Sequence, residues 1–415
     1  MKTYLLKSIY LYSFSVIFIL FSCGKDPVEI LPVDPVPINL TTDQVSLIKS
    51  ENSFAFDIFK KVAGSSQESQ NLIISPLSIS YALSMTLNGA KGTTRDAMLE
   101  ALRVTGLTPE IINNSYKSLS EALLSVDSRV ILSVANSVWT ENNFVVKKPF
   151  TDILTTYYNA ESKSFDIADT QVPKLVNTWI ESKTNGLIKN MVDKLDESTV
   201  MLLINAIYFK GKWNSQFDKA NTVQKSFYKP GGATVDVPMM KQKSEFKVYT
   251  GEGFVLAEFP YGQGNFVMDV ILPDENLGLN TMIQSITDKS FTGWLNAMYK
   301  REIDLSFPRF KYGYKQKLKD ILASMGMGIA FTDNADFSNI SDIPVMISEV
   351  LHQAFIETNE EGTEAAAATI VGISTTSMPP PPLVLNIDHP FLYIIRETST
   401  NSILFMGKVA DPLAN

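Results

Sequence analysis

The chain has 415 residues, of which 45% are hydrophobic and 19% charged, the proportions of an ordinary soluble globular protein. Its formal net charge of −8 at pH 7 argues against a basic surface, so neither a nucleic acid nor an anionic membrane surface is an expected partner. One cysteine excludes an internal disulfide bond. One cysteine and two histidines are also too few for a typical zinc site, so no metal and no cofactor are expected.

Residues 1–22 have the features of a secretory signal peptide. Lys2 and Lys7 give a positive start, and an apolar run over 9–21 ends shortly before Cys23. This run is too short and too polar to predict a membrane span. The letters LFSC resemble a bacterial lipobox, which implies cleavage before Cys23 and attachment of lipid, palmitate included, to that residue. The alternative is a plain signal peptide that is cleaved nearby.

Residues 23–45 are predicted to carry the lipid anchor and to form a tether. The segment is rich in proline, which favours an extended and semi-rigid chain. Its prolines are Pro27, Pro32, Pro35 and Pro37. An ordered arm packed on the domain is the alternative. Beyond the tether there is no linker and no internal repeat, which predicts one large domain over 46–415.

Two helices are predicted first in this domain. The segment 52–62 carries apolar residues at helical spacing, which is typical of an amphipathic helix. A second helix is expected to begin at Ser75, because serine is a good cap and Pro76 suits the first helical position. Gly89 or Gly92 can end it. Its apolar residues point in several directions, which predicts a buried helix.

Further helices alternate with strands along the chain. The segment 93–102 is predicted as a capped helix with acids in its first turn, and another helix is expected from Pro173 to near Gly186. Residues 200–204 are almost wholly apolar, which suits a strand buried on both faces.

Strands are also predicted over 265–273 and 302–310, and a terminal hairpin over 391–397 and 403–409. The mixture indicates an α+β fold without regular βαβ alternation.

Enzyme signatures are missing from the sequence. It contains no HExxH, no Walker loop and no GxSxG, and the glycines of 326–331 lack the third glycine of a dinucleotide fingerprint. A hydrolase with a catalytic triad would have to use His352 or His389. His389 precedes a proline and is expected to be an ordinary turn residue. The chain is therefore not expected to be an enzyme, and no catalytic residue is assigned.

Five stretches of the chain are distinctive. They are NLIISPLSISYALSMTLNGAKGTT (71–94), VNTWIESKTNGLI (176–188), VMLLINAIYFKGKW (200–213), FIETNEEGTEAAAAT (355–369) and FLYIIRETSTNSILFMGKVADP (391–412). In this order they resemble segments of the serpin family of serine protease inhibitors. The resemblance covers about 45 to 412. It implies the serpin fold, in which several helices surround three β-sheets and a reactive-centre loop, about 360–382 here, is exposed near the C-terminus.

The resemblance also implies a mechanism. A serine protease binds the loop as a substrate, cuts it and forms an acyl-enzyme with it. The freed loop then inserts into the main sheet as a new strand, which traps the attached protease. The segment that corresponds to the family's hinge consists of Glu360, Glu361, Gly362, Thr363, Glu364, Ala365, Ala366, Ala367 and Ala368. A flexible loop or a short helix is the alternative for the alanine run, because alanine is the best helix former.

The residues of the loop are compatible with insertion on independent grounds. In a strand, alternate residues share a face. One face would carry Thr363, Ala365, Ala367, Thr369, Val371 and Ile373, which are all uncharged. Glu364 would lie on the opposite face, where it can remain in water. A proline would remove a ladder hydrogen bond and a buried charge would be costly, and neither occurs on the inward face.

The family's usual spacing places the reactive bond between Thr376 and Ser377, with Thr375 or Met378 as alternative specificity residues. No lysine or arginine occurs between 363 and 385, so trypsin-like proteases, whose pocket needs a cation, are not expected targets. The small uncharged residues favour elastase-like or subtilisin-like serine proteases, and a cysteine protease is a further class of target.

Positions that match the family's shutter, the cluster that holds the two halves of the main sheet together, are Ser75, Ser78, Asn205 and His352. Trp213 and Glu360 match the breach, where insertion begins. The alternative for each is an ordinary core or surface contact. In the segment that corresponds to the family's glycosaminoglycan-binding helix, 109–130, Lys117 and Arg129 are the only cations, so no heparin-type cofactor is expected.

These observations together predict a monomeric, exported inhibitor of serine proteases. It would be held by lipid on the bacterial outer membrane, facing the periplasm or the cell surface, because no aspartate follows Cys23 in the letters CGKD. Its only contact with the membrane would be the lipid anchor. The alternative is a non-inhibitory binding protein that uses the serpin fold as a scaffold.

Overall fold

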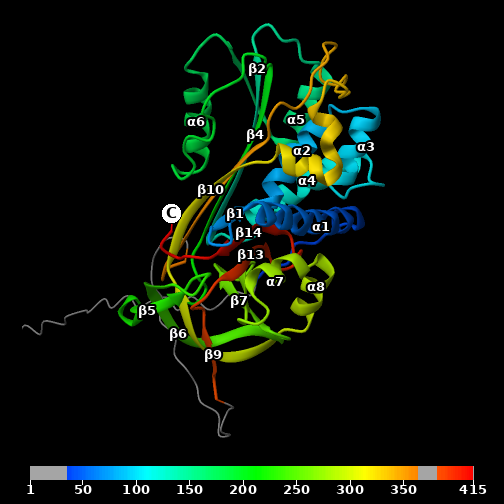
Figure 1. Ribbon diagram of the computed structural model, residues 1–415. Helices are drawn as coiled ribbons and strands as arrows, with labels where there is room; N and C mark the ends of the chain where they lie inside the picture. Colours follow the sequence, from blue (N-terminus) through cyan, green and yellow to red (C-terminus); the bar gives the residue numbers. More distant parts are fainter. Residues whose placement is uncertain (1–34, 363–380, 415) are drawn as a thin grey trace, which may run out of the picture. The chain divides into compact units, whose positions relative to one another are not determined.

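The computed structural model describes residues 35–362 and 381–414. Helices α1 to α5 lie together on one side of β2 and β4, and α6 lies on the other side of these strands (Figure 1). Helices α7 and α8 lie beside β7. The helices are α1 (Thr42–Ser65), α2 (Pro76–Leu87), α3 (Gly92–Ala101), α4 (Pro109–Ser125), α5 (Lys148–Tyr158), α6 (Val172–Lys183), α7 (Leu279–Ser285), α8 (Asp288–Asn296) and α9 (Lys319–Leu322).

The strands form three sheets, as predicted. The largest has nine strands in the order β1 (Leu72–Ile74), β14 (Ile403–Val409), β13 (Phe391–Glu397), β8 (Phe266–Pro273), β7 (Phe254–Tyr261), β6 (Thr234–Gly251), β9 (Tyr299–Pro308) and β12 (Leu383–Asn386), with β5 (Val223–Tyr228) also paired to β6. A second sheet has the order β3 (Glu161–Phe165), β2 (Val130–Glu141) and β4 (Met201–Gly211). The third pairs β10 (Phe310–Lys317) with β11 (Leu351–Thr358).

The predicted terminal hairpin, β13 and β14, is the centre of the core. Every residue of both strands is buried. Aromatic side chains from both smaller sheets pack on it: Phe209 of β4 lies 6.3 Å from Phe405, and Phe310 of β10 lies 5.8 Å from Tyr393, between ring centroids. The two smaller sheets therefore cover one hairpin side by side, although no ladder joins them among the described residues.

The prediction for α2 is confirmed. Ser75 caps the helix by accepting a hydrogen bond from the backbone N–H of Ser78, and Pro76 is the first helical residue. The helix ends at Leu87 and is buried on nearly all sides. Gly89 then allows close packing, because a Cβ at that position would collide with the side chain of Ile340.

Two local predictions are wrong. The helix expected over 93–102 is α3, but its cap residue, Lys91, makes no side-chain cap hydrogen bond, and its first turn holds no acid. Thr94 instead accepts a hydrogen bond from the backbone of Asp336, a tertiary contact that local spacing cannot indicate. In β4, Met201, Leu202 and Leu203 are only partly buried, because this end of the strand borders an open cavity.

The described part of the chain begins with an arm that already contacts the domain. Val36 accepts a hydrogen bond from Asn265, and the backbone N–H of Ile38 donates to Ser399 at 2.9 Å. Helix α1 follows at Thr42, four residues before the predicted start of the domain. No helix within 35–362 or 381–414 is both long enough and apolar enough to cross a membrane.

Candidate functional site

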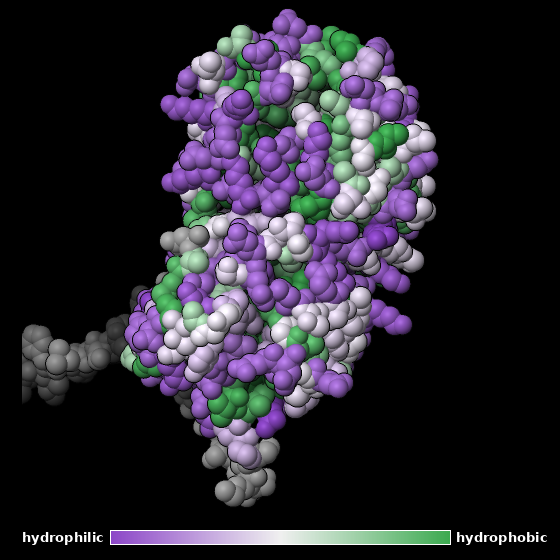
Figure 2. Space-filling model, in the orientation of Figure 1, coloured by the Kyte–Doolittle hydropathy of each residue, from purple (hydrophilic) through white to green (hydrophobic). Residues whose placement is uncertain are grey.

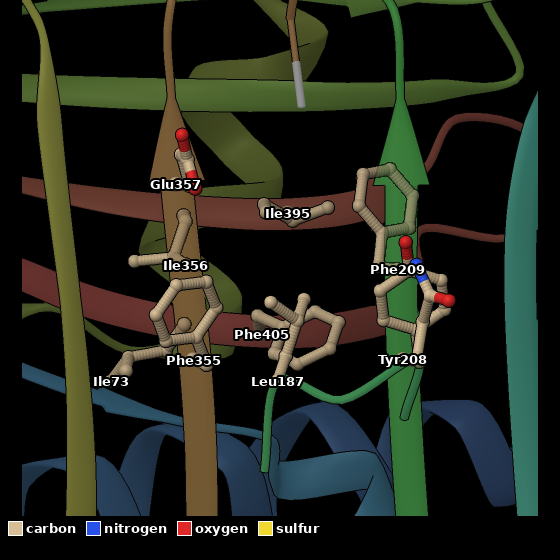
Figure 3. A pocket seen from close by; sticks show the side chains of 10 residues that line it. Ile73, Leu187, Tyr208, Phe209, Phe355, Ile356, Glu357, Ile395 and Phe405 are labelled. Atoms are coloured by element: carbon tan, nitrogen blue, oxygen red, sulfur yellow. The ribbon is translucent and has the colours of Figure 1, made fainter. Parts of the chain in front are cut away.

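The candidate site is a gap between β4 and β11. The two strands run in the same direction on either side of a cavity of about 120 Å³ (Figure 3). Aromatic and aliphatic side chains line it, with the buried hairpin as its floor. Its lining consists of Ile73, Asn185, Leu187, Tyr208, Phe209, Phe355, Ile356, Glu357, Ile395 and Phe405. The gap is thus a narrow, mostly apolar slot between two strand edges.

The direction of the two strands limits what can fill the slot. Both strands end near the same point, where the bridge between Lys212 and Gly362 lies. A further strand between β4 and β11 that starts at this point would run antiparallel to both of them. Such a strand would pair with the backbone groups of both edges at once.

Toward the start of β11, the predicted shutter residues lie together in one buried cluster. The backbone N–H of Ser75 donates to Nε2 of His352 at 3.0 Å, and the hydroxyl of Ser75 donates to the carbonyl of Leu404 at 2.7 Å. The hydroxyl of Ser78 donates to the side-chain oxygen of Asn205. The cluster connects α2 to β4, β11 and β14.

His352 is neutral in this cluster. Because Nε2 accepts the hydrogen bond from Ser75, that nitrogen carries no proton. Burial lowers the pKa of His352 from its ordinary value to about 4, since no group nearby compensates a charge on the ring. The ring is therefore an uncharged acceptor near neutral pH, which is a structural role.

Sequence reasoning missed one member of the cluster. The side-chain amide of Asn205 donates to Asn136 of β2 at 2.6 Å, and Asn136 in turn donates to the carbonyl of Tyr158 at 2.6 Å. No local pattern distinguishes Asn136 from a surface asparagine. It extends the shutter across the three-stranded sheet to the end of α5.

At the other end of the slot, the predicted hinge makes a tight turn. Asn359 and Gly362 exchange two backbone hydrogen bonds of 3.1 Å. Gly362 has φ of +114°, and a Cβ there would collide with the carbonyl of Gly211 and the N–H of Trp213. Glycine is required here both for its backbone conformation and for its lack of a side chain.

Glu360 fixes this turn to the body of the protein. Its side chain is 1% exposed and accepts hydrogen bonds from Arg309, at the β9–β10 junction, and from the hydroxyl of Thr222. Burial alone would raise the pKa of Glu360, but these hydrogen bonds lower it below its ordinary value. The carboxylate is thus charged and paired. Arg309 and Thr222 were not predicted, because they are distant in sequence.

Two further contacts hold the turn. Glu361 forms an ion pair with Lys219, and its carbonyl accepts the backbone N–H of Trp213 at 3.1 Å. The indole of Trp213 donates to the carbonyl of Asn359 at 2.9 Å and stacks on Tyr261, with ring centroids 4.4 Å apart. The predicted breach residues Trp213 and Glu360 therefore both contact the hinge.

Several predicted positions lie outside the described residues. They are Cys23, the hinge residues Thr363, Glu364, Ala365, Ala366, Ala367 and Ala368, and the reactive-bond residues Thr376 and Ser377.

Neither histidine contacts a serine hydroxyl in the described ranges. His389 lies between the carboxylate of Asp388, at 2.9 Å, and the carbonyl of Pro273, at 2.8 Å.

Comparison with known proteins identifies the family. A profile of the family described as serpin (serine protease inhibitor) matches residues 49–412. The chain belongs to the serpin family.

Other comparisons agree with this assignment. The chain is 33% identical over 374 residues to Iripin-2 of Ixodes ricinus, across 88% of this chain and 94% of that protein. Its structure is similar to that of the thermophilic serpin tengpin in the native state, with a TM-score of 0.80 and 33% identity over 91% of this chain and 97% of the other. Human thyroxine-binding globulin complexed with thyroxine is similar at a TM-score of 0.81 and 26% identity, over 90% and 100% of the two chains.

The breach of this serpin can be tested with a matched pair of variants. Glu360→Gln should lower the free energy of unfolding by about 1–3 kcal/mol, because it removes the charge of a buried carboxylate that accepts hydrogen bonds from Arg309 and Thr222. Glu361→Gln should cost at most about 1 kcal/mol, because Lys219 is 65% exposed and surface ion pairs are weak. Urea unfolding followed by tryptophan fluorescence measures both. Equal losses in the two variants would contradict this interpretation of the breach.

The shutter predicts a dependence on pH. A buried histidine with a lowered pKa contributes stability that is fully present above its ordinary pKa of 6.5 and is lost as pH falls toward about 4. Wild-type protein should therefore lose up to about 3 kcal/mol from this group over that range. His352→Gln, which does not titrate, should lack this component. The difference between the two unfolding curves, measured from pH 7 to pH 4, isolates it. A constant difference across that range would contradict the prediction.

Proposed function

We propose that this serpin inhibits serine proteases as a suicide substrate and is not itself an enzyme. The protease cuts the chain near Thr376 and Ser377, and the segment after Gly362 inserts between β4 and β11 while still bound to the enzyme. The observation that carries the proposal is the hinge turn. It bonds to β11 on one side and to β4 on the other, so it already begins a strand in the slot.

The two bridges at the turn define the register of the inserted strand. With the Asn359–Gly362 pair as the starting point, an inserted strand would have Thr363 opposite Thr358 of β11, and the Lys212–Gly362 pair would set it opposite Gly211 of β4. Both neighbours are buried. The hydroxyl of Thr358 has no hydrogen-bond partner within the part of the chain that the structure describes, and a threonine directly opposite can supply one.

If this register continues, the uncharged residues of the inserted strand lie opposite the buried residues of β11. Along β11 the residues are alternately buried and partly exposed, with His352, Ala354, Ile356 and Thr358 buried. Their partners would be Thr369, Ala367, Ala365 and Thr363, the uncharged face expected from sequence. Glu364 would lie opposite Glu357 and Lys210, which are both partly exposed. The register from the turn and the chemistry of the loop thus agree independently.

The same register brings the strand to the shutter. Six residues beyond Thr363, Thr369 would lie between His352 of β11 and Asn205 of β4. At this position the hydroxyl of Thr369 could form hydrogen bonds with the hydroxyl, amide and imidazole groups of the shutter. The serpin would therefore exchange shutter contacts between α2 and the strands β4 and β11 for contacts to a new central strand.

The sequence of the reactive-centre loop predicts the class of target protease. The segment 363–385 contains no lysine or arginine, so the proposed targets are elastase-like or subtilisin-like serine proteases, with cysteine proteases as a further class. We also propose that the protein is exported and held by lipid on Cys23 at a bacterial outer membrane, facing the periplasm or the cell surface. The support is the signal-like sequence of 1–22 and the lipobox-like LFSC.

A second candidate function is ligand binding without inhibition. Its support is the similarity to thyroxine-binding globulin, a serpin-fold protein whose structure holds thyroxine. The intact small-residue hinge favours inhibition over this alternative.

The test of inhibition is the formation of a covalent complex. Mixing the protein with an elastase should yield an adduct that survives boiling in detergent, and mass spectrometry of the released peptide should give a cut at Thr376–Ser377 or a neighbouring bond. Trypsin should form little or no adduct. Complete digestion of the loop with free, active elastase would instead favour the binding protein.

The register predicts a pair of loop variants with opposite outcomes. Thr363→Arg places a cation on the buried face beside Thr358 and Gly211, so cleavage should outpace insertion and the variant should become a substrate. Glu364→Arg places the same cation on the outer face, so adduct formation should be retained within a fewfold. Gel analysis of adduct against cleaved protein measures the partition. A loss of adduct in both variants, or in neither, would contradict the proposed register.

A further inference from the structure

A buried carboxylate lies in the helical end of the molecule, where the proposed inhibition does not use it. Glu51 of α1 is 6% exposed. Its side chain accepts hydrogen bonds from Ser80 of α2, at 3.0 Å, and from the hydroxyl of Tyr116 of α4. No cation pairs with it in 35–362 or 381–414. A buried carboxylate without a cation is costly to ionise.

The groups that face Glu51 from the neighbouring helices are tyrosines. Tyr81 of α2 lies 4.6 Å from Tyr116, and Tyr158 of α5 lies 6.2 Å from Tyr81 and 6.1 Å from Tyr116, between ring centroids. Burial raises the pKa of all three tyrosines, so they remain protonated. Burial also raises the pKa of Glu51 to about 7, although the hydrogen bonds from Tyr116 and Ser80 oppose this. Glu51 is thus the member of this cluster that can change charge near neutral pH.

Two routes connect this cluster to the shutter. Ser80, which bonds to Glu51, lies on α2 two residues after Ser78. The second route runs through α5. The carbonyl of Tyr158 accepts a hydrogen bond from Asn136, and Asn136 accepts one from Asn205. Asn205 is the residue to which Ser78 donates. A displacement of α2 near Ser80, or of α5 at Tyr158, would therefore act on the same shutter bonds.

We propose that Glu51 is a proton-controlled switch on the shutter. With its proton, Glu51 ties α1, α2 and α4 together and keeps the shutter bonds in place. Without its proton, the buried charge favours separation of these helices and entry of water, and the shutter opens more readily. The opening of the shutter does not depend on the proposed function. Only the further step, entry of the reactive loop through the open shutter, rests on it.

The sign of the effect follows from the raised pKa. An acid with a raised pKa in the folded state binds more protons there than in the unfolded chain. Its stabilising contribution is fully present below the ordinary pKa of about 4.5 and is lost as pH rises through about 7. The contribution of Glu51 to closure should therefore be largest in mildly acidic solution and be lost above neutral pH.

The experiment compares three intact proteins between pH 5 and pH 8. Glu51→Gln keeps the approximate shape of the protonated acid but cannot ionise. Asp57→Asn is the matched control, because it removes an exposed carboxylate from the same helix, where it pairs with Arg103. Hydrogen exchange of α2 and β4 amides, corrected for the intrinsic pH dependence, measures shutter opening. Thermal unfolding measures stability.

From pH 5 to pH 8, the protection of shutter amides in wild type and in Asp57→Asn should fall by roughly tenfold or more relative to that in Glu51→Gln, which retains the opposite contribution of His352. Wild-type stability should fall over the same range by more than that of Glu51→Gln. Equal profiles in wild type and Glu51→Gln would overturn the proposal and leave any pH dependence to His352, to Asp269, whose pKa burial raises to about 6, or to His389. A stability difference without a change in shutter exchange would also overturn it. Failure to trap any protease would refute inhibition but would leave the exchange result intact.

Discussion

The structure depends on a pair of strand edges that face each other without being joined. In a closed sheet the backbone groups of β4 and β11 would bond to a neighbour, yet no ladder connects these strands in the described ranges. Both edges lie over the buried hairpin of β13 and β14, so they are held at the right place for a strand between them. Unpaired edges favour pairing with a further strand, and in the proposed mechanism the hinge would supply one end of it.

The slot is closed at its two ends by contacts of different chemistry. The shutter consists of neutral groups, a buried imidazole with two serines and two asparagines, whose hydrogen bonds are short-ranged and must all be satisfied together. The breach uses a charged pair, Glu360 with Arg309, and stacked aromatic rings. In the proposed mechanism, the neutral contacts of the shutter could be replaced by an incoming strand without leaving a buried charge unpaired, whereas the charged contact would anchor the hinge from which that strand begins. Glu51, which we propose acts on the shutter, adds a group whose charge changes with pH.

Local sequence patterns predicted a helix or strand correctly where its cap and its apolar face depend only on neighbouring residues in the chain. The cap at Ser75, the proline at the start of α2 and the alternating or continuous apolar strands near the C-terminus all describe neighbours in the chain. They failed at α3, where Thr94 bonds to a distant loop, and at the first residues of β4, which border a cavity. In both cases a tertiary contact, or its absence, outweighed the local preference.

By itself the sequence determined several of the helices and strands, among them α2, β13 and β14, together with the glycine at the hinge and the uncharged alternate residues from Thr363 to Ile373, because periodicity and backbone freedom are local properties. Only the tertiary structure decided which distant groups meet. Arg309 reaches Glu360, Asn136 extends the shutter, and Glu51 lies among tyrosines without a cation. The physical reason is that burial, and with it the strength of a hydrogen bond or the pKa of an acid, depends on surroundings assembled from segments far apart in the chain.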